Sequence, residues 1–249
     1  MKLVARTLLA AALTLSMSSA ALATYSGQIW IPSTDAKGFG EVNISIDNYV
    51  RFSNSDNAGA NTYDAGVTVG VLPFEKLKME VGVDYLTDGQ QDDDSDMSDN
   101  PIYFNAKVAV PEDAAFKGMP ALAVGMFGMN TANTDLSANI LYGLVAKTLP
   151  VVGRISAGGY HGSEHGMAST SNDGVMLSWD RTMSEISDKL WMSVDYMSGK
   201  SAFGAVSAGA AWAFTPNVSL LVGVNAYNPY QSEKAGGKPT FTTQLDINF

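Results

Sequence analysis

The only two histidines of the chain lie together in one short stretch, His161-Gly162-Ser163-Glu164-His165. A histidine base beside a serine hydroxyl is the pairing that acyl transfer needs, and His161 and Ser163 would share one face of an extended strand. His161, Glu164 and His165 could instead coordinate a divalent metal ion. Because short motifs of this kind are unspecific, a polar surface loop is the favoured interpretation, and we expect neither a catalytic centre nor a metal site here.

A second candidate for chemistry is a stretch in which aspartates alternate. Asp92, Asp94 and Asp96 have the spacing of a calcium-binding loop, and Asp99 follows them. The glycine that such a loop needs at its sixth position is absent, because Met97 stands there. We therefore expect a solvated acidic loop with, at most, weak binding of divalent cations.

The composition excludes several classes of protein. The 249 residues carry 25 Asp and Glu against 15 Lys and Arg, so no basic surface is available for a phosphate backbone, and we expect no nucleic-acid partner. The chain has no Cys, which excludes disulfides, thiolate nucleophiles and cysteine-based zinc sites. No P-loop, nucleophile elbow or dinucleotide fingerprint occurs in a suitable context. We accordingly expect no cofactor and no enzyme activity.

The first 23 residues are typical of a secretory signal peptide. Lys2 and Arg6 supply the positive start, residues 8–15 are apolar, and Ala21 and Ala23 place small side chains at the −3 and −1 cleavage positions. No later stretch has the roughly 20 nearly continuous apolar residues of a membrane helix. The exported chain is therefore expected to be either soluble or a membrane β-barrel.

Beyond the signal peptide, hydrophobicity repeats with a period of two, which indicates strands. In residues 76–85, for example, apolar side chains occupy the odd positions, and polar residues or glycine occupy the even ones. Twelve such segments occur, at 41–52, 62–71, 76–87, 102–110, 119–129, 136–148, 151–160, 174–182, 189–197, 203–214, 218–227 and 240–249. Most are long enough for a tilted strand to cross a bilayer. We predict an all-β fold, a single closed antiparallel transmembrane barrel of about 12 strands over residues 40–249.

The connections between these segments alternate in length. Short turns at 72–75, 149–150 and 215–217 alternate with long polar loops at 53–61, 88–101, 161–173 and 228–239, whereas 111–118 and 198–202 depart from the rule. The last alternating segment ends at Phe249. In these features the chain resembles bacterial outer-membrane β-barrel proteins of the porin-like kind. The resemblance implies a place in the outer membrane, contact with membrane lipid and outer-leaflet lipopolysaccharide, and Phe249 as the signal read by the barrel-assembly machinery.

The strands of a soluble barrel or sandwich would also alternate between apolar and polar residues, but with the apolar face inward. Charged residues in mid-strand, such as Lys78, Glu80 and Lys107, favour a polar interior instead. Aromatic residues on the apolar faces also stand near strand ends, as two interfacial girdles would require. They are Phe52, Tyr63, Tyr85, Tyr196 and Phe241 toward the long loops, and Trp212, Phe214 and Phe249 toward the short turns. We therefore expect lipid outside and polar side chains inside.

The spacing of His161 and Ser163 also resembles that of the outer-membrane phospholipase, another twelve-stranded barrel. In that enzyme, a His and a Ser two residues apart lie on the outer face of the barrel wall, with an Asn nearby. Here Gly162 intervenes, Glu164 and His165 follow, and no Asn partner can be placed. A lipid hydrolase is therefore a distant alternative.

The inward face is predicted to carry both acids and bases. The expected lumen-lining residues are Glu41, Asp47, Arg51, Asp64, Lys76, Lys78, Glu80, Asp84, Lys107, Lys147, Arg154, Asp180, Asp195 and Asp246. Such a mixed set can line a wet channel and set its selectivity, or it can pair across strands and fill the bore. The leading hypothesis is a narrow porin-like channel for small polar solutes or ions. The alternative is a non-conducting structural or interaction barrel that displays acidic surface loops, and the oligomeric state is left open.

Residues 24–39 precede the first predicted strand and contain the apolar run Ile29-Trp30-Ile31. An exposed run of this kind is unfavourable in the aqueous periplasm. We expect the segment either to fold into the lumen as a plug or to lie along the membrane interface as a periplasmic extension.

Overall fold

The computed structural model describes residues 26–54, 58–88, 100–131, 137–164, 166–167, 171–228 and 237–249. The signal peptide expected over residues 1–23, the acidic stretch from Asp92 to Asp99, and His165 lie outside these residues. Within the described part of the chain, no helix is long and apolar enough to span a membrane.

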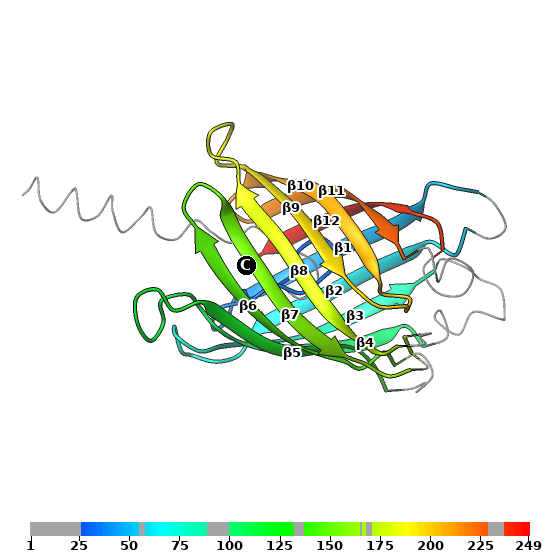
Figure 1. Ribbon diagram of the computed structural model, residues 1–249, viewed down its shortest axis with the longest axis horizontal. Helices are drawn as coiled ribbons and strands as arrows, with labels where there is room; N and C mark the ends of the chain where they lie inside the picture. Colours follow the sequence, from blue (N-terminus) through cyan, green and yellow to red (C-terminus); the bar gives the residue numbers. More distant parts are fainter. Residues whose placement is uncertain are drawn as a thin grey trace, which may run out of the picture.

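Twelve antiparallel strands form one closed barrel (Figure 1). They are β1 (Val42–Arg51), β2 (Thr62–Gly70), β3 (Lys78–Thr87), β4 (Ile102–Val110), β5 (Ala121–Asn130), β6 (Ile140–Leu149), β7 (Gly153–His161), β8 (Asp173–Thr182), β9 (Leu190–Met197), β10 (Ala205–Thr215), β11 (Val218–Tyr227) and β12 (Thr240–Asn248). Each strand pairs with its neighbours in sequence, and β1 closes the barrel against β12. The predicted architecture, a single closed antiparallel barrel of 12 strands, is confirmed.

Alternate side chains along each strand point to opposite sides of the wall. On β1, Ile44 and Ile46 are exposed on the outside, whereas Asn43, Ser45 and Asp47 are buried inside. The aromatic residues predicted to form the two girdles are all exposed on the outer surface. A continuous apolar exterior of this extent is unfavourable in water and is what a lipid bilayer requires. The predicted orientation of the two faces is therefore correct.

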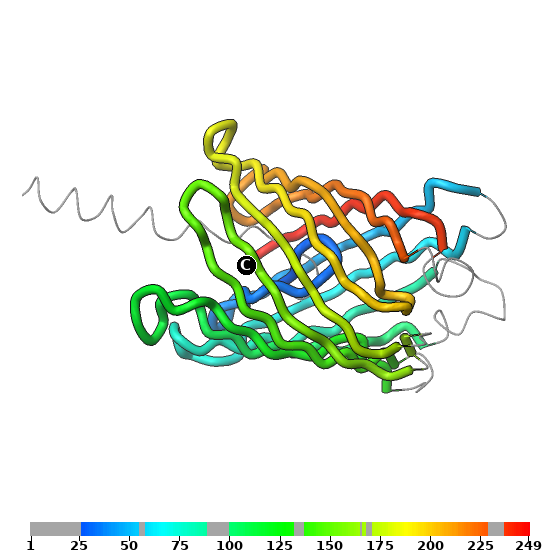
Figure 2. The backbone as a smooth tube through the Cα atoms, viewed as in Figure 1, coloured from blue at the N-terminus to red at the C-terminus, as the bar shows by residue number. Residues whose placement is uncertain are grey.

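The barrel has two distinct rims. The C-terminal residue Phe249 lies at the rim where β2–β3, β6–β7 and β10–β11 are joined, which we call the turn rim (Figure 1). The opposite rim, where β1–β2, β3–β4 and β7–β8 are joined by longer connections, is the loop rim. Residues 26–38 form a hairpin that enters the barrel from the turn rim, and Figure 2 shows it in blue, surrounded by the strands. We call these residues the lumenal hairpin.

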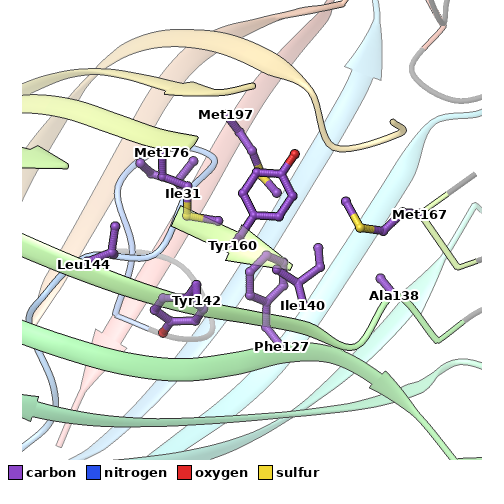
Figure 3. Packing of buried hydrophobic residues seen from close by; sticks show 10 residues of the cluster. All are labelled: Ile31, Phe127, Ala138, Ile140, Tyr142, Leu144, Tyr160, Met167, Met176 and Met197. Atoms are coloured by element: carbon purple, nitrogen blue, oxygen red, sulfur yellow. The ribbon is translucent and has the colours of Figure 1, made fainter. Parts of the chain in front are cut away.

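The interior divides into a polar part and an apolar part. Apolar side chains from β5 to β9, from two connections between these strands and from the hairpin form a buried cluster (Figure 3). It comprises Ile31, Phe127, Ala138, Ile140, Tyr142, Leu144, Tyr160, Met167, Met176 and Met197. The opposite wall, formed by β12, β1, β2 and β3, carries buried polar and acidic side chains instead. The lumenal hairpin lies between the two.

Candidate functional site

The lumenal hairpin is built by a tight turn. Gly27 and Pro32 pair as an antiparallel bridge, and the amide of Gln28 donates to the carbonyl of Ile31 over 2.7 Å. The hydroxyl of Ser33 donates to the carbonyl of Ser26, which joins the two arms. These bonds join the two arms of the hairpin, and the backbone groups that remain are bonded by side chains of the wall.

On the side of β3 and β4, the hairpin is held by a buried ion pair. Lys107 on β4 lies 3.1 Å from Glu80 on β3, and both side chains are essentially inaccessible to solvent. The amide and hydroxyl of Ser26 donate to Glu80 over 2.9 and 2.8 Å, and the amide of Lys37 donates to it over 2.9 Å. Lys107 in turn donates to the carbonyl of Ser26 over 2.5 Å. A buried ion pair is tolerated only when further hydrogen bonds satisfy it, and here the hairpin supplies them.

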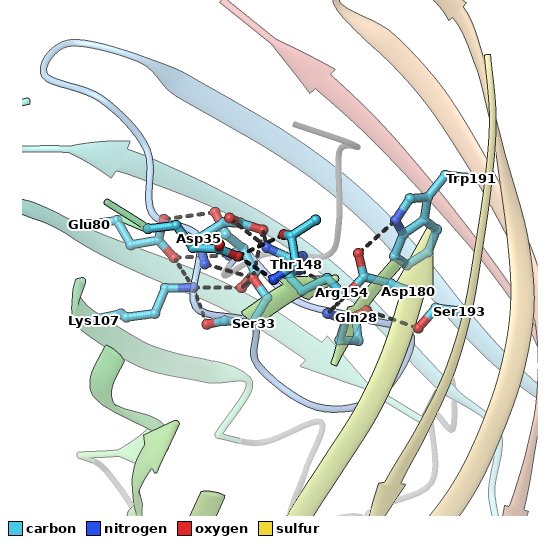
Figure 4. Close-up of polar contacts among 12 residues, drawn as sticks. Gln28, Ser33, Asp35, Glu80, Lys107, Thr148, Arg154, Asp180, Trp191 and Ser193 are labelled. Carbon is cyan, nitrogen blue, oxygen red and sulfur yellow. Dashed lines mark hydrogen bonds and ion pairs between the residues drawn. The ribbon is translucent and has the colours of Figure 1, made fainter. Parts of the chain in front are cut away.

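On the opposite side, Arg154 bridges the hairpin to the wall (Figure 4). Its guanidinium on β7 lies 2.7 Å from Asp35 of the hairpin and 2.9 Å from Asp180 on β8. Asp180 also accepts hydrogen bonds from Gln28 over 3.0 Å and from the indole of Trp191 over 3.2 Å. Burial alone would raise the pKa of Asp35, but the charge and hydrogen bond of Arg154 outweigh it and hold that pKa below its ordinary value of 3.8.

Apolar contacts position the tip of the hairpin. Ile29 packs with Trp191, Ala211 and Leu221, and Ile31 belongs to the larger cluster of β5 to β9. A pair of glycines in register, Gly209 on β10 and Gly223 on β11, makes room for Ile29. A β-carbon at either position would lie 3.2 or 3.4 Å from the Ile29 side chain. The wall is therefore shaped to receive the tip.

Asp195 and Trp30 define the end of the tip nearest the loop rim. Asp195 on β9 accepts the amides of Ile29 and Trp30 over 2.7 and 2.9 Å. The indole of Trp30 meets Tyr49 and Tyr227 edge-to-face, with ring centroids 5.3 and 5.4 Å apart. We call the rings around Trp30, those of Tyr49, Phe203 and Tyr227, the aromatic recess.

Four carboxylates line the wall that faces away from the apolar cluster. Asp47 on β1 lies directly opposite Asp64 on β2. One step toward the turn rim, Asp246 on β12 and Asp84 on β3 flank the small residues Ser45 and Gly66 in a single row. Like charges in direct cross-strand register are unfavourable for folding. We call Asp47, Asp64, Asp84 and Asp246 the acidic wall.

Most of the residues expected to line the lumen lie on inward-facing strand positions. These are Asp47, Arg51, Asp64, Lys78, Glu80, Asp84, Lys107, Arg154, Asp180, Asp195 and Asp246. Lys76 lies in the exposed connection before β3 and Glu41 lies just before β1, so both sit at the turn rim rather than in the bore.

Lys147 differs from the expectation. On β6 the inward positions are held by Ile140, Tyr142 and Leu144, so Lys147 has the parity of the outer face. Its ammonium lies 2.9 Å from Glu112, in the connection between β4 and β5 at the turn rim. The sequence predicts the inner face for Lys147, because a charged residue in a strand that is otherwise apolar on both faces is expected to point into the lumen.

The apolar lumen cluster is the part that sequence reasoning missed. Phe127, Tyr142, Tyr160 and Met176 were not expected inside a polar bore. One sequence signal was available: Ile140 to Ala146 is an almost unbroken apolar run, which indicates a strand covered on both faces rather than one with an aqueous side.

Of the candidate chemical residues at the loop rim, His161 and Ser163 are described, and each has a different hydrogen-bond partner. His161 Nδ1 lies 2.7 Å from Asp173 at an exposed position. The hydroxyl of Ser163 instead donates to the carbonyl of Ser137 over 2.7 Å. Among the residues whose positions are described, no group of three or more metal-binding side chains is placed to hold an ion.

No protein-family model matches the chain, and no curated protein matches it in sequence. Solved structures that it is similar to include an outer membrane channel from Pseudomonas putida F1, at 10% identity over 86% of this chain and 96% of that one, with a TM-score of 0.47. OmpF of Salmonella typhi, in complex with daunomycin, is 10% identical over 84% and 96% of the two chains, with a TM-score of 0.38. The low-pH structure of Pseudomonas putida OprB is 10% identical over 84% and 93%, with a TM-score of 0.32. These similarities are too low to indicate a solute or a mechanism for this chain.

Proposed function

We propose that this chain is an outer-membrane channel for small polar solutes or ions, and that its lumenal hairpin closes the channel as a removable plug. The proposal rests on one observation. The hairpin is a separate segment within the bore, and side chains of the wall hold it there. Two ion pairs of the wall also bind the hairpin: that of Lys107 and Glu80 on one side, and that of Arg154 and Asp180 on the other. Charged residues are rarely buried without partners, and here the hairpin supplies partners in addition to the ion pairs within the wall.

The closed state is expected to predominate. Burying Ile29 and Ile31 contributes roughly 1.5–3 kcal/mol for each side chain, and the polar contacts add to this. The hydrogen bonds of the hairpin to charged side chains contribute about 1.5–3 kcal/mol each and its neutral ones about 0.5–1.5 kcal/mol each, and water or a solute that enters the bore can replace them. Displacing the hairpin therefore leaves the barrel wall intact.

The placement in the outer membrane follows from the outer surface. An apolar band bounded by aromatic girdles suits a bilayer, and most of the long connections lie at one rim. Phe249 is consistent with an assembly signal: its backbone pairs with Val42 of β1 over 3.1 and 2.8 Å, while its side chain is exposed at the turn rim. Contact with membrane lipid, with lipopolysaccharide and with the barrel-assembly machinery belongs to the same proposal.

The acidic wall supports a preference for cations. With the hairpin displaced, Asp47, Asp64, Asp84 and Asp246 would face an aqueous bore from four neighbouring strands. Rings or rows of carboxylates of this kind select cations in other channels.

A second candidate, a non-conducting structural barrel, is favoured by one observation. Phe127, Tyr142 and Tyr160 fill part of the bore with large rings, independently of the hairpin. If these rings close the path by themselves, removal of the hairpin would not open it.

Planar-bilayer conductance of the purified protein without its signal peptide, compared with a variant that lacks residues 24–38, separates the two candidates. A channel plugged by the hairpin gives rare or small steps in the intact protein and larger, stable steps in the deletion variant. Silence from both proteins would support the structural barrel. Heat-modifiable migration in gels serves as the folding control for each preparation.

A further inference from the structure

Trp30 occupies the aromatic recess in the way that a bound molecule would. Its indole contacts Tyr49 and Tyr227 edge-to-face, at interplanar angles of 84° and 81°, and it lies 6.4 Å from the ring of Phe203. The indole N–H donates to the carbonyl of Phe203 over 2.8 Å. Edge-to-face contacts of this kind contribute about 0.5–1.5 kcal/mol beyond burial. The recess thus recognises a flat aromatic ring.

A carboxylate lies beside this ring site. Asp195 is 1% exposed, and one of its oxygens accepts two amide N–H groups of the hairpin tip. An amide that donates to this carboxylate already makes a charge-assisted hydrogen bond, and an ammonium donor would add the attraction of an opposite charge, which is strongest at a buried site. A cationic donor would therefore satisfy Asp195 better than the neutral amides of Ile29 and Trp30 do.

We propose that Asp195 and the aromatic recess form a binding site for an arylalkylammonium, a small solute in which a short alkyl chain joins an aromatic ring to an amine. The ring takes the place of the Trp30 indole, and the ammonium takes the place of the two amides at Asp195. Trp30 is then an intramolecular competitor that keeps the site filled while the channel is closed. This inference rests on the proposed function in one respect, namely that the hairpin can leave the bore.

The charge of the lumen discriminates among related solutes. The acidic wall attracts a cation that enters the bore and repels an anion. An anion with the same ring would also leave Asp195 facing a like charge. An alkylamine without a ring would lose the contacts of Tyr49 and Tyr227.

Isothermal titration calorimetry of the detergent-solubilised barrel with tryptamine tests the site. Butylamine and indole-3-propionate are the matched probes, the first without the ring and the second with the opposite charge. Tryptamine alone is expected to bind. Equal binding of all three probes, or no binding of tryptamine to any variant, would overturn the proposal.

Substitution of Trp30 provides the sharper test. If the tip fills the site about nine-tenths of the time, deletion of residues 24–38 raises the affinity for tryptamine about tenfold, because the whole competitor is removed. Trp30→Ala removes the competing ring but keeps the two amides at Asp195, so it should raise the affinity in the same direction. Trp212→Ala, on the outer face of β10, should change nothing. Adding Asp195→Asn to Trp30→Ala should abolish the gain. A lower or unchanged affinity in Trp30→Ala would contradict the inference.

The outcome does not depend on whether the barrel conducts. Calorimetry reports binding without any current, so silence in a bilayer would remove the channel and leave the site standing. Conversely, large conductance steps in the deletion variant without tryptamine binding would retain the channel and remove the site.

Discussion

The guanidinium of Arg154, on β7, lies 2.7 Å from the carboxylate of Asp35, a residue of the lumenal hairpin 119 positions away in sequence. The same guanidinium lies 2.9 Å from Asp180 on β8. Arg154 therefore ties the hairpin to two neighbouring strands of the wall, and it is the clearest single connection through which the closed state can be weakened.

Arg154→Ala should destabilise the closed state. The substitution removes charge-assisted hydrogen bonds to Asp35 and Asp180, each worth about 1.5–3 kcal/mol, and leaves two carboxylates close together. Single-channel recording should show an open probability at least about tenfold higher, since 1.4 kcal/mol corresponds to a factor of ten. The control is Arg181→Ala, which removes an arginine paired with Glu185 at the turn rim. An unchanged open probability in Arg154→Ala would exclude this role.

Acidification should open the channel through Asp35. The pKa of Asp35 in the closed state is held below 3.8 by Arg154, with Lys107 contributing at longer range. The ion pair therefore stabilises the closed state fully above the ordinary pKa, and this contribution is lost as the pH falls through the lowered value. Conductance titrated from pH 7 to pH 3 should rise below about pH 4.

Asp35→Asn is the control variant for the pH experiment. The variant should be more open at neutral pH, and its rise on acidification should be smaller than that of the unsubstituted protein. The same rise in both proteins would assign the pH response to other carboxylates.

Lys107→Met should destabilise the folded barrel strongly. The substitution leaves Glu80 buried without its cation, and breaking a buried ion pair in this way costs about 3–5 kcal/mol. The double substitution Lys107→Met with Glu80→Gln should recover part of the loss. Denaturant unfolding in detergent, followed by gel migration, measures both. Equal stability of the single variant and the unsubstituted protein would show that water replaces the lysine.

Neutralising the acidic wall should reduce cation selectivity. Asp47 and Asp64 face each other across β1 and β2, so Asp47→Asn with Asp64→Asn removes two carboxyl groups from one point of the bore. Reversal potentials in a salt gradient, measured in the variant that lacks residues 24–38, should shift toward the value of a non-selective pore. Asp188→Asn, at an exposed position between β8 and β9, is the control and should shift them little.

The strand count, the strand positions and the orientation of the two faces could all be read from the order of residues. Period-two alternation is a local property, and an apolar face can be inferred to be the lipid face wherever charges occupy the opposite positions, as at Glu80 and Lys107 on β3 and β4. The girdle residues, such as Tyr85 and Trp212, follow from the same parity together with their distance from the strand ends.

Tertiary structure alone decided what fills the bore. Asp35 and Trp30 contact Arg154 and Asp195, which lie 119 and 165 residues away in sequence. Ser26 contacts Glu80 and Lys107, which lie 54 and 81 residues away. No local pattern encodes contacts over such separations. Where both faces of a strand are apolar, as on β6, alternation does not indicate which face points into the barrel. For this reason the sequence predicts the wrong face for Lys147 and does not predict the cluster around Tyr142. A local period specifies which side chains share a face, whereas closure of the barrel determines what each face meets.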